Sequence, residues 1–148
     1  MLRISKLSDY ATLLLAEMAG SPGSVFSASD LAERGRLELP TVAKVMKLLC
    51  QAGLVESFRG AAGGYRLARP VEQISVADIV AAIEGPIGMT ECSVHQGACS
   101  HEAHCGVSAP WQRVSQAVEA TLRGIALSDM CVGYARSRAA IPHTLQAR

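Results

Sequence analysis

The chain has 148 residues, of which 49% are apolar and 4% aromatic, and its formal net charge is +1. This length allows one domain with its own core, or a small domain with an extension, and the composition favours a helix-rich soluble protein. No apolar run approaches the length needed to cross a bilayer, so we expect no membrane partner. No secretory signal is visible. We therefore interpret the five cysteines as reduced thiols or ligands, and expect a cytoplasmic protein.

Positive charge is concentrated in one part of the chain. Residues 34–69 carry seven Lys or Arg against two Asp or Glu, a net charge of +5, whereas residues 71–148 have a net charge of −2. Such clustering is typical of a surface that attracts nucleic acid. The alternative interpretation is a solvated basic face without a partner.

Two helices are predicted near the N-terminus. Ser5 and Ser8 are possible caps of the first, and the helical spacing of apolar residues extends it to about residue 20. Ser27 and Asp30 then resemble a capping box, with Asp in place of the usual Glu. This pattern predicts a short helix that ends at Gly35.

A third helix is predicted to begin at Pro40, which suits the first turn of a helix, and to end at Gly53. Its apolar residues share one face, which predicts that this face is buried. The opposite face carries polar and cationic side chains that could enter the major groove of DNA. These side chains belong to Thr41, Lys44 and Lys47.

A glycine-rich hairpin follows the third helix. Residues 54–58 and 65–68 have the pattern of strands, joined by a tight loop over 59–64. Arg59 and Arg66 lie beside the tip, where they could contact phosphates or a narrow minor groove. Three helices and a hairpin in this order predict a winged helix-turn-helix, in a fold that is mainly α with one small β-hairpin. The alternative is a helical domain with an incidental hairpin.

The second half of the chain predicts two further helices. One is capped at Ser75 and stops at Gly85, and a long one begins at Pro110. The long helix has a narrow apolar seam, which favours dimerisation over packing within its own domain. The seam consists of Val107, Trp111, Val114, Val118, Leu122 and Ile125. We expect a DNA-binding domain at 1–86, a cysteine-rich loop at 87–108, a dimerisation helix and C-terminal segment at 109–135, and a polar tail at 136–148.

Three cysteines and three histidines share one short segment. They are Cys92, His95, Cys99, His101, His104 and Cys105. Thiolates are soft ligands that select zinc, copper(I) or iron–sulfur clusters. The gaps of six and five residues between the cysteines are too wide for the paired knuckles of structural zinc folds, and suit a loop around a larger group.

Several motifs occur in a fixed order along the chain. They are MLRISKLSDYA at 1–11, DLA at 30–32, GLVESFRG at 53–60, GGYRL at 63–67 and SVADI at 75–79. In these motifs and in the cysteine segment, about 1–135 of the chain resembles the Rrf2 family of winged-helix repressors, which includes IscR-like and NsrR-like proteins. The motifs LPTVAK at 39–44, EGPI at 84–87 and TECS at 90–93 are most similar to regulators of SUF iron–sulfur cluster assembly.

The resemblance implies a homodimer that binds a pseudo-palindromic operator on double-stranded DNA. It also implies an iron–sulfur cluster, often 2Fe–2S, whose ligands match Cys92, Cys99 and Cys105. Arg59 matches a wing arginine that contacts the minor groove. Ala43 stands where IscR-like proteins have an acidic residue that contacts a base, so the operator of those proteins does not carry over.

The resemblance leaves the fourth cluster ligand open. Ser108 stands where IscR-like proteins have a histidine ligand, and the first gap between cysteines is six residues where relatives commonly have five. NsrR-like proteins use an acidic residue in the first helix of the partner subunit, and Asp9 occupies the matching place. His95, His101 and His104 are the local alternatives.

We therefore expect a cluster-dependent repressor of SUF-type genes. One alternative is a zinc-stabilised winged-helix transcription factor, in which a Cys₃His set holds a structural metal without sensing. Another is a regulator of the same family that responds to nitric oxide or redox state. We do not expect an enzyme or a small-molecule substrate, because no catalytic triad, phosphate loop or C-x-x-C motif is present.

Overall fold

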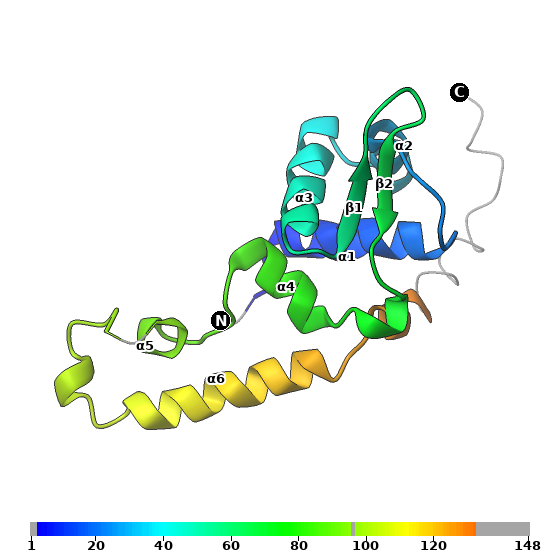
Figure 1. The fold of residues 1–148 in the computed structure, drawn as a ribbon. Coiled ribbons are helices and arrows are strands. Elements are labelled where there is room, and N and C mark those ends of the chain that lie inside the picture. Colours follow the sequence, from blue (N-terminus) through cyan, green and yellow to red (C-terminus); the bar gives the residue numbers. More distant parts are fainter. Residues whose placement is uncertain (1–2, 96, 133–148) are drawn as a thin grey trace.

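The computed structural model describes residues 3–95 and 97–132 (Figure 1). The helices and strands are α1 (Lys6–Ala19), α2 (Ala28–Gly35), α3 (Leu39–Gln51), β1 (Val55–Phe58), β2 (Gly64–Leu67), η1 (Val71–Gln73), α4 (Val76–Glu84), α5 (Glu91–Val94), η2 (Glu102–His104) and α6 (Ser108–Arg123). Residues 127–132 are also helical. Within these described ranges, no helix has the length and apolarity that crossing a bilayer requires.

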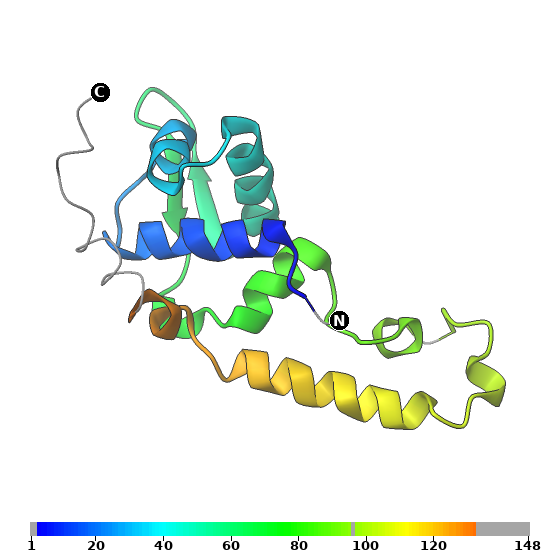
Figure 2. The same ribbon diagram turned by 180° about the vertical axis from the view of Figure 1, so that it is seen from behind.

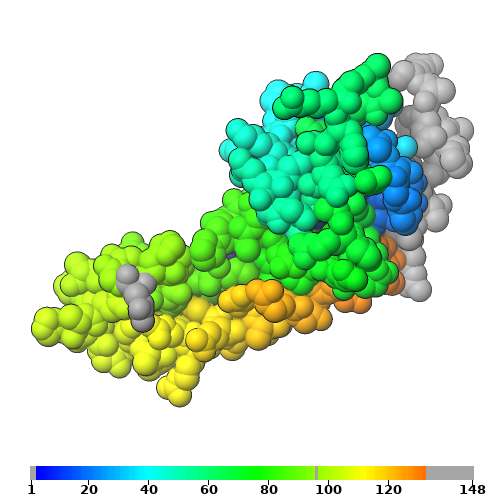
Figure 3. All heavy atoms as spheres, viewed as in Figure 1, coloured from blue at the N-terminus to red at the C-terminus, as the bar shows by residue number. Residues whose placement is uncertain are grey.

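The molecule has a compact head and a long arm (Figures 1 and 3). Helices α1–α4 and the hairpin form the head, and α6 packs against α4 and α5 and extends away from the head. The segment with α5 and η2 lies at the far end of the arm. This architecture confirms the prediction of a mainly helical fold with one small antiparallel hairpin. The tail predicted for 136–148 lies outside the described residues.

The helices α1, α2 and α4 begin at side-chain caps that the sequence predicts. Ser27 and Asp30 form a reciprocal capping box at α2, with both hydrogen bonds 3.0 Å long, and Ser75 caps α4 in the same way. Ser5 caps α1 by accepting the Ser8 N–H. Ser8 itself is not a cap: its buried hydroxyl donates to the carboxylate of Glu84, at the end of α4.

The core of the head lies between α1, α2, α3 and α4. The largest fully buried side chains include Leu14, Leu15, Met18, Leu31, Met46, Leu49, Leu54, Ile74, Ile79 and Leu127. Each such side chain contributes about 1.5–3 kcal/mol by leaving water. Leu127 enters this core from beyond α6, and its N–H donates to the Ile74 carbonyl at 2.7 Å. The chain after α6 therefore anchors the arm to the head.

The hairpin has a third partner that the sequence analysis missed. β1 and β2 pair in register from Val55–Leu67 to Phe58–Gly64. Phe26, between α1 and α2, pairs with Tyr65 through two backbone hydrogen bonds of 2.9 and 2.8 Å. The first predicted strand, 54–58, begins one residue before β1, and the second, 65–68, is shifted by one residue from β2. The Ala68 N–H still donates to the Leu54 carbonyl.

The arm helix α6 begins two residues before the predicted start at Pro110. Its first turn therefore includes Pro110, which needs no hydrogen-bonded N–H there. At its other end, the Ile125 carbonyl accepts the Val76 N–H at 2.9 Å. Arg123 lies 3.6 Å from the Asp78 carboxylate at the start of α4. These contacts fix the C-terminal end of α6 against the head.

Candidate nucleic-acid interface and cysteine segment

Helix α3 presents a basic face to solvent. Val42, Val45, Met46 and Leu49 are buried, which turns the opposite side of the helix outward. Lys44 and Lys47 are exposed on that side, together with Ala43, whereas Thr41 is half-buried at its flank. Neither lysine forms an ion pair within the described residues. Their charges are free for an anionic partner.

The loop of the hairpin depends on glycine. A Cβ on Gly63 would lie 2.5 Å from the Phe58 carbonyl oxygen, and one on Gly64 would lie 2.3 Å from the Phe26 carbonyl oxygen. Both neighbours are backbone atoms that cannot move aside cheaply. The glycines therefore let the loop fold back tightly, and Arg59 is exposed at its start. No hydrogen bond, ion pair or ring contact to Arg59 occurs in the part of the chain that the structure describes.

Arg66 is held more firmly than Arg59. Its guanidinium Nη2 donates to Glu56 Oε2 at 2.9 Å, and Glu56 is its direct cross-strand partner. The same guanidinium lies 4.7 Å from the centre of the Phe58 ring, a cation–π contact. The sequence pattern predicted the position of Arg66 beside the tip but neither of these two partners.

The basic groups converge at one end of the head. The N-terminal part of α3 and the loop between β1 and β2 both lie at the end farthest from α6, in the two opposite views (Figures 1 and 2). A helix N-terminus and a projecting loop at the same end form the usual docking surface of a winged helix on a duplex. Thr41, near the start of α3, and Arg59, in the loop, therefore belong to this end of the head, whereas Lys47 lies in the second half of α3 and Arg66 lies in β2.

The three cysteines of the arm are not gathered into one group. Cys92 is buried in α5, whereas Cys99 and Cys105 are half-buried in the turns on either side of η2. No cluster of three or more His, Cys, Asp or Glu with metal-binding geometry occurs among the described residues. The histidines of this segment, His95, His101 and His104, are all exposed. The donor chemistry fits a soft metal group, but the three thiols must move closer to share one.

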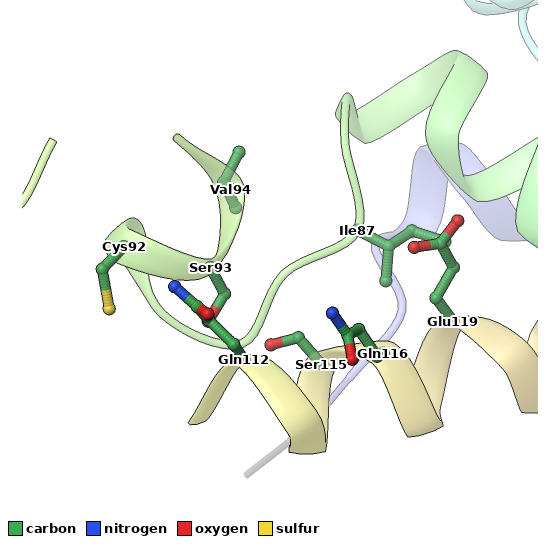
Figure 4. A pocket seen from close by; sticks show the side chains of 8 residues that line it. All are labelled: Ile87, Cys92, Ser93, Val94, Gln112, Ser115, Gln116 and Glu119. Carbon is green, nitrogen blue, oxygen red and sulfur yellow. The ribbon is translucent and has the colours of Figure 1, made fainter. Parts of the chain in front are cut away.

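Cys92 borders a small cavity between α5 and α6. The cavity has a volume of about 220 Å³, and α6 contributes Gln112, Ser115, Gln116 and Glu119 to its wall (Figure 4). The buried Ser115 hydroxyl accepts the Met89 N–H at 2.9 Å. This hydrogen bond fixes the start of the cysteine segment on α6.

The other two cysteines belong to the head. Cys50 and Cys131 are half-buried and pack against the core, as expected for small apolar side chains. Partial burial raises the pKa of the Cys50 thiol and also the pKa of the Cys131 thiol. A raised pKa lowers the fraction of thiolate, which is the form that binds metals and acts as a nucleophile.

The apolar seam of α6 is largely uncovered. Val107, Trp111, Val114 and Ile125 are exposed, with Val107 55% and Trp111 43% accessible, whereas Val118 and Leu122 are partly buried. Packing within the chain therefore accounts for only part of the seam.

The chain matches a known family over most of its length. The model of the Rrf2 family, described as iron-dependent transcriptional regulators, matches residues 4–133. This chain belongs to the Rrf2 family. It is 30% identical over 146 residues to the HTH-type transcriptional regulator IscR of Cereibacter sphaeroides, covering 95% of this chain and 94% of that protein. It is 31% identical over 131 residues to Protein rrf2 of Nitratidesulfovibrio vulgaris, covering 87% of each.

Solved structures of Rrf2-type regulators have the same fold. CymR, the global cysteine regulator of B. subtilis, superposes with a TM-score of 0.68 at 30% identity, over 89% of this chain and 98% of that one. IscR of T. potens superposes with a TM-score of 0.68 at 28% identity, over 97% of this chain and 96% of that one. Family and fold confirm that this Rrf2 protein is a winged-helix, DNA-binding transcriptional regulator and not an enzyme.

Proposed function

We propose that this Rrf2 protein is an iron–sulfur-cluster-dependent repressor of SUF-type cluster assembly genes. The observation that carries the proposal is the cysteine segment, which holds three soft ligands at the far end of an arm attached to a winged-helix head. The description of the family as iron-dependent regulators supports it. We place the protein in the cytoplasm, where such thiols remain reduced.

The head binds the operator through α3 and the hairpin. Thr41, Lys44 and Lys47 face the major groove, and Arg59 approaches the phosphates or the minor groove. Arg66 is the second basic group of the hairpin and lies beside its tip, paired with Glu56. The exposure of the two lysines on α3 and of Arg59 in the hairpin loop supports this assignment. Phosphate contacts of this kind supply most of the affinity and make it depend on salt.

The protein acts as a homodimer that pairs its α6 helices. Exposed apolar side chains support an interface with a second copy: Trp111 and Val114 lie in α6, and Val107 and Ile125 lie just outside its two ends. Two recognition helices then meet half-sites about 34 Å apart, one turn of the duplex. The domain organisation follows: a DNA-binding head at 1–86, a cluster-binding loop at 87–108, and a dimerisation segment at 109–135.

Cys92, Cys99 and Cys105 hold the cluster, and Asp9 of the partner subunit is one candidate for the fourth ligand. Asp9 is exposed near the start of α1, which supports its availability, and exposed His95, His101 and His104 are the alternatives. A bound 2Fe–2S cluster would supply a crosslink between the thiolates that responds to iron and redox state. The Ser115–Met89 hydrogen bond transmits a change in this segment to α6.

The test is to purify the protein without oxygen and measure its visible absorption with its iron, sulfide and zinc content. We expect a red-brown protein with equal iron and sulfide, and a colourless one after Cys92, Cys99 and Cys105 are all changed to Ser. Cys50→Ser is the matched control and should keep the colour. Wild-type operator repression and iron response in the triple variant would contradict the proposal.

A zinc-stabilised regulator is the second candidate. The exposed histidines next to Cys99 and Cys105 favour it, because Cys₃His is a common structural zinc set. One zinc per chain in a colourless wild-type protein would support this candidate and contradict the iron–sulfur cluster proposal. DNA binding through the head would stand in either case.

A further inference from the structure

One face of the hairpin carries a neutralised group of three side chains. Side chains alternate across a strand, so Glu56 and Phe58 of β1 share a face, and the register places Arg66 of β2 on that same face. Gly64, opposite Phe58, has no side chain, which leaves the ring open to the Arg66 guanidinium. This outer face of Glu56, Phe58 and Arg66 has no net charge.

The two wing arginines are thus in different states. Arg59 has no partner among the described residues, whereas the Arg66 guanidinium is bound by the Glu56 carboxylate and stacked on Phe58. The side chains of Arg66 and Glu56 remain 41% and 49% exposed, so DNA can reach both. An exposed ion pair is weak, and a phosphate competes with the carboxylate for the same guanidinium.

We propose that Glu56 limits the affinity of the wing for DNA by acting as an internal counter-ion that withholds Arg66 from the phosphates. Glu56 is then a positioning residue: it acts through Arg66 and contacts no DNA itself. Arg59 carries the wing's phosphate contact, and the affinity of the regulator stays below the value that its number of basic residues would give. This inference rests on the proposed contact between the wing and DNA.

The salt dependence of DNA binding tests the proposal. The probe is a fluorescent duplex of mixed sequence, about 30 base pairs long, because binding without sequence preference is almost entirely electrostatic. Fluorescence anisotropy of the full-length protein gives the dissociation constant at a series of salt concentrations. Each phosphate neutralised adds about 0.9 to the magnitude of the slope of log affinity against log salt.

Glu56→Gln should steepen the slope by about 0.9 for each wing, which corresponds to about eightfold tighter binding per wing at about 0.1 M salt. The double variant Glu56→Gln, Arg66→Gln should keep the wild-type slope, because its hairpin face is again neutral and no guanidinium has been freed. Glu56→Asp keeps the charge and should bind as wild type. Circular dichroism melting confirms that each variant is folded.

Three outcomes would overturn the proposal. An unchanged slope in Glu56→Gln means that the carboxylate does not withhold Arg66. A shallower slope in the double variant than in the wild type means that Arg66 already contacts phosphate. A double variant with the steepened slope of Glu56→Gln means that the gain does not come from Arg66 and that Glu56 simply repels DNA. The variant Arg59→Gln distinguishes a failure of the Glu56 proposal from a failure of the proposed function. If Arg59→Gln has the same slope as the wild type, the hairpin does not contact DNA and the proposed wing contact is wrong.

Discussion

The close approach of the hairpin to residue 26 makes Gly64→Ala a sharp test of the wing structure. The added Cβ would lie 2.3 Å from the Phe26 carbonyl oxygen and 2.7 Å from its carbon. Relief of this overlap requires the Phe26 and Tyr65 backbones to separate, which breaks two hydrogen bonds of 2.9 and 2.8 Å. Each is worth about 1 kcal/mol net, so we expect a loss of about 2 kcal/mol in the free energy of unfolding.

Urea unfolding at a fixed protein concentration measures this loss, because association would otherwise shift the midpoint. Gly106→Ala is the matched control: no atom lies within 4 Å of its added Cβ, and its backbone is not in the left-handed region. We expect that control within about 0.5 kcal/mol of wild type. If Gly64→Ala is as stable as Gly106→Ala, the strand pairing at Phe26 does not constrain the wing.

Three further predictions concern the junctions between elements. Leu127→Ala removes a fully buried side chain and should cost about 2–5 kcal/mol in the free energy of unfolding measured in urea. Ser115→Ala leaves the Met89 N–H without its acceptor and should cost about 1–3 kcal/mol by the same assay; no loss would mean that water replaces the hydroxyl. The hydrogen bond from Ser8 lowers the pKa of Glu84 below its ordinary 4.5. The ionised Glu84 carboxylate therefore stabilises the fold fully above pH 4.5, and this stabilisation is lost as the pH falls through the lowered pKa. Glu84→Gln should therefore flatten the acid limb of a plot of melting temperature against pH, and an unchanged limb would contradict this.

Features with local causes were predictable from the sequence. The capping boxes at Ser27 and Ser75 join residues three apart, and the buried face of α3 follows from helical periodicity. The glycine-rich loop after Phe58 likewise predicted the hairpin. These signals need no knowledge of the rest of the chain, and they were sufficient for the winged-helix architecture.

Features that depend on distant residues were not predictable in the same way. Ser8 has the sequence context of a cap, but its hydroxyl bonds to Glu84, 76 positions away. The pairing of Phe26 with Tyr65 brings an isolated residue to a hairpin edge, and a single residue has no strand periodicity. Glu56 and Arg66 could have been found, since a cross-strand pair of opposite charge follows once the hairpin register is known.

The cysteine spacing predicts three soft ligands in one loop but not how they are arranged in space. Cys92 is fixed against α6, whereas Cys99 and Cys105 lie in turns whose hydrogen bonds are formed mostly within the segment itself. Few contacts with the head or arm determine where these two thiols lie. The local sequence therefore does not determine how these two thiols are arranged in space.

Because the cysteine segment is attached at both ends, its length can change without changing the rest of the fold. Met89 is bonded to Ser115 before the segment, and α6 begins directly after it at Ser108. Closing a loop of about 20 residues costs only on the order of 0.05 kcal/mol more when one residue is inserted. Insertions between Cys92 and Cys99 are thus nearly neutral for folding, and the spacing of the thiols can change during evolution while the head stays unchanged.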